Sequence, residues 1–275
     1  MNTGKITAPF RKLGLIHIFD KVKFQYIKAK NRKVNQAFLK AHPNVMLPPD
    51  YLIFETFHLH YESYYFGGQK SAKSIVNQVA PFITLKNKKI LDWGCGPGRI
   101  IRHLHEQVQD CEIHGVDYNE TNLNWCADNI PNVTFKKNEI NPPLPYQEST
   151  FDFVYGISIF THLSEANHPA WMAELARVSK KGAVLLLTSH GPIFKRILTA
   201  EENKAYDKGS IVTRGKAVEG HRVFAAFHPP TYFRSLLEEH FEVLRYTEGT
   251  EQDWGIQQDH WVVQRKYVCL LVGFA

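Results

Sequence analysis

The stretch ILDWGCGPGRI, Ile90 to Ile100, decides the fold because it joins a short apolar run directly to three glycines at alternate positions. A strand that ends in Gly-x-Gly-x-Gly and opens a helix lets bare backbone approach a ligand closely. It also presents the unpaired N–H groups of the helix start to the polar parts of that ligand. A dinucleotide site would place a third small residue at position 99, which is Arg99 here. The pattern is instead D-x-G-x-G-x-G, starting at Asp92.

Strands and helices alternate around this stretch. Expected strands cover residues 89–93, 111–118, 133–137, 151–158 and 182–189, and expected helices cover 69–80, 100–108, 120–129 and 171–178. The strands are continuous apolar runs, which indicates burial on both faces in an α/β fold with a doubly wound parallel sheet. Ligands bind at the carboxyl ends of such strands. Asp117 ends the second strand, where a carboxylate can accept both hydroxyls of a ribose, although nicotinamide sites share that feature.

Composition and cysteine usage bound the class of protein. The 275 residues, 44% hydrophobic and 22% charged, suffice for one sizeable core. No apolar run approaches the roughly 20 residues that span a bilayer, and no signal-peptide pattern opens the chain. The four cysteines show neither C-x-x-C nor Cys/His spacing, so they are interpreted as reduced thiols rather than disulfides or zinc ligands. We expect a cytoplasmic protein without a metal site.

The first 40 residues form a basic arm. They hold ten Lys or Arg against a single acid, Asp20, so the arm carries +9 and the body −3. Within the arm, one helical stripe flanked by lysines comprises Leu15, Ile18, Phe19, Val22 and Tyr26. One interpretation is a helix at the surface of an anionic membrane, peripheral to its inner face, or on a polyanion. The other, which we favour, is a solvated helix packed on the body.

Four motifs in order resemble those of the class I S-adenosylmethionine-dependent methyltransferases. They are LDWGCGPGR, GVDYNE, FDFVYGISIFTHL and ELARVSKKGAVLLLT, and the resemblance runs from residue 69 to 189 and more weakly to the end. It implies a Rossmann-like sheet of seven strands with the last antiparallel, the final two lying in FEVLRYTEG and HWVVQRKYVCLLVG. Residues 69–275 would form the methyltransferase domain and residues 1–68 a helical extension. The implied reaction consumes S-adenosylmethionine and leaves S-adenosylhomocysteine.

The resemblance also implies cofactor contacts at the strand ends. The glycine turn would line the methionine and ribose, the second strand would bind ribose and flank adenine, the third would meet the adenine edge, and the fourth would border the transferred methyl. In chain order these residues are Asp92, Gly94, Gly96, Gly98, Asp117, Tyr118, Asn138, Glu139, Ile157 and Ser158.

A general base is needed only where the acceptor must lose a proton, because methyl transfer otherwise depends on holding the nucleophile and the methyl in line. His162 follows the fourth strand and His190 ends the fifth, so both are candidates, with His162 preferred. His228 precedes a later expected helix.

Two regions outside the core are expected to determine the acceptor. Residues 51–68 are aromatic and are interpreted either as a lid, with a hinge at Gly67 and Gly68, or as extra core packing. Residues 191–228 form an insertion too long for an ordinary loop, which indicates a cap over the substrate. The residues proposed to contact the acceptor are Tyr64, Tyr65, Phe160 and His228.

The expected acceptor is a small molecule or a glycan, methylated at oxygen or nitrogen. Nucleic acid is not expected, because the body is acidic and no Asn-Pro-Pro-Tyr/Phe tetrad follows the fourth strand. Two alternatives stand beside this function. One is an S-adenosylmethionine-binding module that has lost catalysis, and the other is an NAD-linked oxidoreductase, which Arg99 disfavours.

Overall fold

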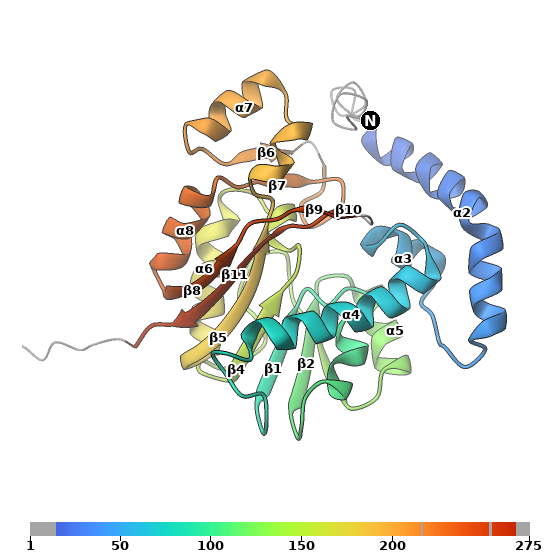
Figure 1. Ribbon diagram of the computed structural model, residues 1–275, viewed down its shortest axis with the longest axis horizontal. Helices are drawn as coiled ribbons and strands as arrows, with labels where there is room; N and C mark the ends of the chain where they lie inside the picture. Colours follow the sequence, from blue (N-terminus) through green and yellow to red (C-terminus); the bar gives the residue numbers. More distant parts are fainter. Residues whose placement is uncertain (1–14, 216, 253–254, 268–275) are drawn as a thin grey trace, which may run out of the picture.

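A seven-stranded sheet forms the centre of the protein, seen in a computed structural model that describes residues 15–215, 217–252 and 255–267. The strands are β1 Lys89–Trp93, β2 Glu112–Asp117, β3 Val133–Lys137, β4 Phe151–Gly156, β5 Ser179–Ser189, β8 Phe241–Thr247 and β11 Asp259–Arg265. Their order across the sheet is β3-β2-β1-β4-β5-β11-β8 (Figure 1). β1 to β5 pair in parallel, and β11 runs antiparallel to both β5 and β8. The expected doubly wound sheet with an antiparallel last strand is confirmed.

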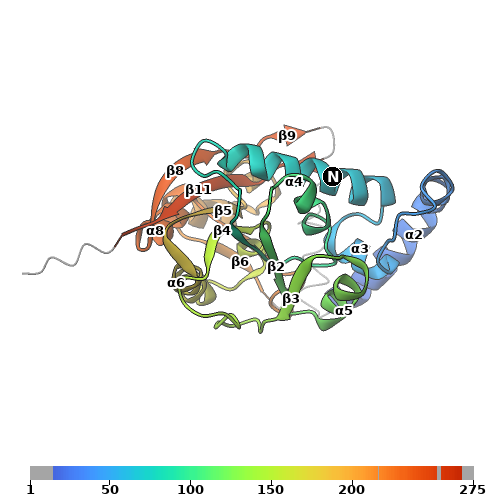
Figure 2. The same ribbon diagram turned by 90° about the horizontal axis from the view of Figure 1, so that it is seen from below.

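Helices cover both faces of this sheet (Figure 2). One face carries α4 Tyr61–Val79, η1 Ile101–Glu106 and α5 Glu120–Asn129, and the other carries α6 Asn167–Val178 and α8 Pro230–Glu238. Successive strand residues alternate between the two layers: Ile90 packs with Ile75 of α4, and Leu91 packs with Met172 of α6. Because both faces of the central strands are covered, the stretch from Ala183 to Leu187 of β5 is buried and apolar at every position and shows no alternation, whereas the edge strand β3 ends in the exposed Lys136 and Lys137.

The glycine turn delays the helix that follows β1. We expected that helix to begin at residue 100, but the chain forms the 3-10 helix η1 from Ile101 to Glu106. Gly96 and Gly98 have φ angles of +53° and +78°, in the left-handed region that an α-helix of L-residues excludes. The helix therefore starts only after the turn is complete.

The predicted hinge at Gly67 and Gly68 is wrong, because both residues lie inside α4. The helix continues unbroken from Tyr61 to Val79, so the predicted boundary at residue 68 also falls within it. A Cβ at Gly68 would collide with the carbonyl oxygen of Arg99, whereas one at Gly67 would meet no described heavy atom within 4 Å. Gly68 is therefore needed for the close approach of α4 to the glycine turn.

The N-terminal extension packs along one edge of the molecule through α2 Ile16–Ala41 and α3 Asp50–Thr56 (Figure 1). Ile16 and Phe38 of α2 are buried, and buried Asn35 donates from Nδ2 to the carbonyl oxygen of Leu59 at 3.1 Å. The helix packs on the body, as the favoured interpretation expected, but it does so through these residues; of the apolar stripe, Phe19 is half-buried and the other four residues are exposed. Among the described residues, no helix is long and apolar enough to cross a bilayer.

The insertion forms a small unit after the carboxyl end of β5. It contains η3 Pro192–Ile197, α7 Ala200–Asp207 and the antiparallel pair β6 Val212–Arg214 and β7 Ala225–Phe227. Outside the insertion, β9 Glu251–Gln252 and β10 Gly255–Ile256 form a second short antiparallel pair. The insertion's own apolar cluster joins Phe194, Tyr206 and Phe227. Figure 1 shows α7 and β6 projecting beyond the sheet.

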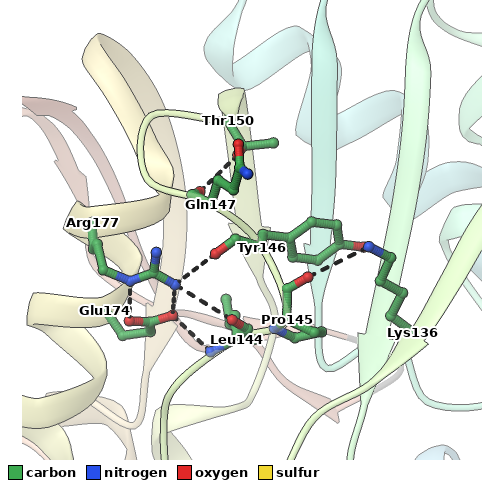
Figure 3. A network of polar contacts seen from close by, with 8 residues as sticks. All are labelled: Lys136, Leu144, Pro145, Tyr146, Gln147, Thr150, Glu174 and Arg177. Carbon is green, nitrogen blue, oxygen red and sulfur yellow. Dashed lines mark hydrogen bonds and ion pairs between the residues drawn. The ribbon is translucent and has the colours of Figure 1, made fainter.

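The connection from β3 to β4 is held on α6 by an ion pair in which Glu174 is buried and Arg177 is partly exposed (Figure 3). Oε1 of Glu174 accepts the N–H of Leu144 at 2.7 Å, and Nη2 of Arg177 donates to the same carboxylate oxygen at 2.6 Å. Nη2 of Arg177 also donates to the carbonyl oxygen of Tyr146 at 2.9 Å. These bonds satisfy backbone groups that no strand pairs, and they fix a loop whose first residues reach the site described below.

The cysteines are consistent with the expected thiols. Cys95, Cys111 and Cys126 are free, the first and last of them buried, and Cys269 lies outside the described residues.

Candidate functional site

A cavity of about 190 Å³ lies at the carboxyl ends of β1, β2, β3 and β4. Its lining begins with the predicted residues after these strands: Gly94, Gly96, Asp117, Tyr118, Asn138, Glu139, Ile157, Ser158 and His162. Sequence analysis therefore predicted many of the residues that line one wall of the cavity. The opposite wall comes from the N-terminal extension and from the insertion.

Two backbone N–H groups hold the carboxylate of Asp117. Its Oδ2 accepts the N–H of Gly96 and its Oδ1 accepts the N–H of Asn119, each at 2.8 Å. The residue is 7% exposed, and burial raises the pKa of its carboxyl group above the ordinary value, although both backbone bonds oppose that rise. Each carboxylate oxygen has two lone pairs, so Oδ2 retains one for a further donor, and Oδ1 has only the long 3.5 Å contact with Nδ2 of Asn122 besides its bond to Asn119. Two vicinal hydroxyls are donors that fit here, the second in place of Asn122 at Oδ1.

Two amide oxygens beside Asp117 are buried without a partner. Asn138 donates from Nδ2 to the carbonyl oxygen of Glu139 at 2.7 Å, and Asn122 reaches Oδ1 of Asp117 at 3.5 Å. Their Oδ1 atoms have no hydrogen-bond partner among the described residues. Leaving a buried acceptor unpaired costs about 1–3 kcal/mol. The amino and hydroxyl groups of an adenosine would supply the missing donors, so this wall fits the nucleoside half of S-adenosylmethionine.

Ser158 is fixed in a strained conformation just past β4. Its φ is +67°, unusual for a residue with a side chain, and its N–H donates to Oγ1 of Thr188 at 2.7 Å. Its hydroxyl oxygen accepts from Nε2 of Gln258 at 2.7 Å and lies 3.0 Å from Oγ1 of Thr161. A hydroxyl engaged on two sides shapes the floor of the cavity rather than serving as a nucleophile.

His162 lines the cavity and has one unprotonated ring nitrogen. Its Nδ1 lies 2.8 Å from the carbonyl oxygen of Phe224, which can only accept, so Nδ1 carries the hydrogen and Nε2 has a free lone pair. Burial lowers the pKa of the imidazole below its ordinary value, against the bond to Phe224, and the charge of Arg222 lowers it further. The neutral ring can therefore accept a proton at neutral pH.

The other two predicted histidines belong to the core under the insertion, and the structure corrects their assignment. His190 bonds from Nδ1 to the carbonyl oxygen of Ala226 at 3.0 Å, its ring centroid lies 4.1 Å from that of Phe194, and burial lowers its pKa to about 3. His228 is fully buried, with Nε2 2.8 Å from Nε2 of His168. Neither belongs to the described lining of the cavity.

Three predicted residues, of which one belongs to the glycine turn, stabilise that turn and do not line the cavity. Asp92, 4% exposed, accepts a hydrogen bond from the hydroxyl of Tyr155 at 2.7 Å, and burial raises its pKa to about 7. The hydroxyl of Tyr64 donates to the carbonyl oxygen of Pro97 at 2.6 Å. A Cβ at Gly98 would collide with Ile130, so that glycine permits close packing of the turn on α5. The structure places them outside the described lining.

Two aromatic residues predicted to contact the acceptor pack elsewhere. Phe160 is fully buried, with its ring centroid 5.1 Å from Trp93 and 5.3 Å from Phe233. Tyr65 packs edge-on against His103 at 4.7 Å, on the α4 side of the sheet. For residues 51–68, the interpretation as core packing therefore holds for the two tyrosines, but not for Glu55 and Thr56, which line the cavity.

Residues 219–222, within the insertion that was expected to form a cap, lie over the cavity, and we call them the cap; the length of the insertion indicated a cap but not which of its residues line the cavity. The N–H of Gly220 donates to the carbonyl oxygen of His162 at 2.9 Å, and Nε2 of His221 lies 3.2 Å from Oε1 of Glu55. Gly220 has a φ of +82°, and a Cβ there would lie 3.1 Å from the ring of Tyr118. The insertion thus reaches the predicted adenine end, joined to the extension across the cavity.

The family model described as "Methyltransferase domain" matches residues 90–182, from β1 into β5. This segment is therefore similar to methyltransferase domains. It contains the glycine turn, Asp117 and His162, and therefore most of one cavity wall. No group of three His, Cys, Asp or Glu side chains that could hold a metal ion occurs in the described parts of the chain.

Two curated methyltransferases are similar to this chain over part of their length. An uncharacterized methyltransferase of Schizosaccharomyces pombe is 33% identical over 107 residues, 35% of this chain and 38% of that protein. A fatty-acid O-methyltransferase of Mycolicibacterium smegmatis is 27% identical over 110 residues, 39% of each protein. The chain thus spans well under half the length of these relatives.

The fold extends beyond the segment that the sequences share. The crystal structure of an S-adenosylmethionine-dependent methyltransferase from Methanosarcina mazei superposes with a TM-score of 0.53 at 20% identity, covering 69% of this chain and 97% of the other. The seven-stranded methyltransferase architecture is therefore common to both proteins.

Proposed function

We propose that the protein transfers a methyl group from S-adenosylmethionine to oxygen or nitrogen of a small-molecule or glycan acceptor. The observation that carries this proposal is that Asp117 and the neutral ring of His162 line one cavity, at the ends of β2 and β4. S-adenosylmethionine supplies an electrophilic methyl group whose sulfonium charge disappears on transfer.

Different residues of this chain would bind the cofactor and surround its methyl group. Asp117 would accept the ribose hydroxyls, and Asn138 would take a donor of the adenine. Ile157, Ser158 and Ile159 would exclude water around the methyl group, where in-line alignment supplies much of the rate. The cap residues Gly220 to Arg222 would close the cavity once it is filled.

His162 gives the site a means of activating a hydroxyl acceptor. Its Nε2 lone pair can take the proton as the acceptor oxygen attacks, and the bond from Nδ1–H to Phe224 holds the ring in that tautomer. An acceptor that is already anionic, or an amine with a free lone pair, would use the same cavity without that step.

An acceptor screen tests the proposal. The full chain is incubated with S-adenosylmethionine labelled in the methyl group and with panels of alcohols, carboxylic acids, amines and glycans. A fatty acid is included because one relative is named for that substrate. We expect label to enter an acceptor in equal amount to the S-adenosylhomocysteine released, and His162→Gln to leave carboxylate acceptors less affected than alcohols.

Two results would contradict the proposal. Tight binding of S-adenosylmethionine with no labelled product across the panels would favour a binding module without catalysis. Turnover of NADH with any carbonyl compound in the panel, in place of methyl transfer, would favour an oxidoreductase.

A further inference from the structure

Helix α2 carries a row of apolar side chains on the face that points away from the body. Four of them, within about 80° of one another around the helix axis, are much exposed. The exposed fractions are 40% for Leu15, 60% for Ile18, 64% for Val22 and 64% for Tyr26. We call these four residues the outer stripe. Exposing a contiguous apolar row on a soluble surface is costly, and such rows mark interaction sites.

The opposite face of α2 packs on the body. Ile16 and Phe38 are 2% and 6% exposed, and Phe24 and Ile27 pack against the cluster that includes Ile53 and Phe54 of α3. These residues lie about 115–165° from the centre of the outer stripe at about 100° per residue. The outer stripe is therefore not needed to hold the helix in place.

Positive charge surrounds the outer stripe and is little compensated. Residues 15–40 contain seven Lys or Arg and one acid, Asp20. Asp20 is turned inward, 4% exposed, and its Oδ1 pairs with Nη1 of Arg222 at 2.8 Å. Lys21 and Lys30 lie on the two flanks of the stripe, about 60° and 40° beyond its edges. An apolar row between cations is the composition of a helix that lies in the interface of an anionic bilayer.

We propose that the outer stripe of α2 docks this protein on an anionic lipid bilayer. The charge of α2 favours an anionic bilayer over a second copy of the chain. Each Lys or Arg near an anionic leaflet adds to the binding free energy, whereas a symmetric dimer contact would bring two cationic helices together, where they repel. Figures 1 and 2 both place α2 at an edge of the molecule, where a flat surface can reach it.

Docking on this face would set the cap of the cavity beside the membrane. Asp20 binds Arg222, and the ring of His17 lies 5.3 Å from that of His221, so the first turns of α2 contact the cap directly. The proposal does not depend on which acceptor is methylated, since it concerns the outer face of α2.

The test is co-sedimentation of the full chain with vesicles. Vesicles of phosphatidylcholine alone are compared with vesicles that also contain phosphatidylglycerol. The stripe variant is Ile18→Ser with Val22→Ser, and the charge variant is Lys21→Glu with Lys30→Glu. Val34→Ser is the matched control, because Val34 is 49% exposed on the same helix but about 160° from Ile18.

We expect the wild type and the control to bind anionic vesicles, with weaker binding at high salt and little to phosphatidylcholine alone. Both variants should lower the partition coefficient at least about tenfold, because each removes buried apolar area or attraction to the leaflet. Their circular dichroism and thermal midpoints should match the wild type, since the substituted side chains are exposed.

The proposal would be overturned by equal vesicle binding in the wild type and both variants, or by none in the wild type. It would also fail if the wild type bound no vesicles but formed a dimer in sedimentation velocity, and the stripe variant were monomeric. That result would show that the outer stripe contacts a second copy of the chain.

Discussion

At the scale of single residues, the site depends on two side chains whose hydrogen bonds fix what they can still do. Asp117 accepts two backbone N–H groups and keeps lone pairs for a ligand. His162 donates from Nδ1 to Phe224 and keeps Nε2 as an acceptor. In both cases the backbone, rather than another side chain, supplies the partner, so the orientation follows from the fold.

His162→Gln should lower kcat for a hydroxyl acceptor by roughly 10²- to 10⁴-fold and leave the affinity for S-adenosylmethionine nearly unchanged. The active form of the base is neutral, so the wild-type rate should fall as the pH drops through the pKa of His162. Burial lowers that pKa below 6.5, so the inflection should lie below 6.5 rather than near neutrality. The measurement is kcat against pH.

His190→Gln serves as the control for this profile, because His190 does not belong to the described lining. It should retain the acidic inflection. A His162→Gln enzyme that kept both the wild-type rate and the inflection would exclude His162 as the base.

At the scale of elements, the glycine turn is shaped by the helix that crosses it. α4 approaches so closely that Gly68 faces the carbonyl oxygen of Arg99, and Tyr64 one turn earlier bonds to that of Pro97 at 2.6 Å. Positioning of the turn thus depends on a segment that precedes the family match at residue 90.

Two neighbouring glycines of α4 should respond oppositely to the same substitution. Gly67→Ala should raise the free energy of unfolding by about 0.5–1 kcal/mol, because alanine suits a helix and its Cβ meets no described atom within 4 Å. Gly68→Ala should lower it by about 1–3 kcal/mol, because its Cβ would force α4 off the turn. Urea unfolding of both variants measures the difference. A gain of stability in Gly68→Ala would show that the two segments are not packed as described.

At the scale of the whole molecule, the sequence predicted the sheet far better than what surrounds it. The continuous apolar strands and the glycine turn determine β1 to β5, because a strand buried on both faces has few alternatives. On α2 the apolar residues occur on both faces, so periodicity alone could not tell the packed face from the exposed one. The sequence therefore predicted a helix that packs on the body, but not that Leu15, Ile18, Val22 and Tyr26 would lie on its exposed face.

Of the candidate site, too, the sequence predicted one part and missed another. Residues directly after a strand, such as Asp117 and Ser158, could be found because strand ends converge in this architecture. Glu55 and His221 could not, since they meet at 3.2 Å only through tertiary packing of two segments far apart in the chain. Histidine residues were overpredicted. His190 and His228 follow strands or precede a helix as His162 does, but neither belongs to the described lining, and His228 is fully buried while His190 is half-buried beside Phe194.

The most direct test of the central claim is calorimetric titration of S-adenosylmethionine and of NAD into the wild type, Asp117→Asn and the exposed-site control Asp128→Asn. We expect the wild type and control to bind S-adenosylmethionine and not NAD. Asp117→Asn should weaken that binding by about 1.5–3 kcal/mol, roughly 10- to 150-fold, because hydrogen bonds to a charged acceptor are lost. Circular dichroism of Asp117→Asn checks that it folds. Equal affinity in a folded Asp117→Asn protein, or preference of the wild type for NAD, would contradict the account.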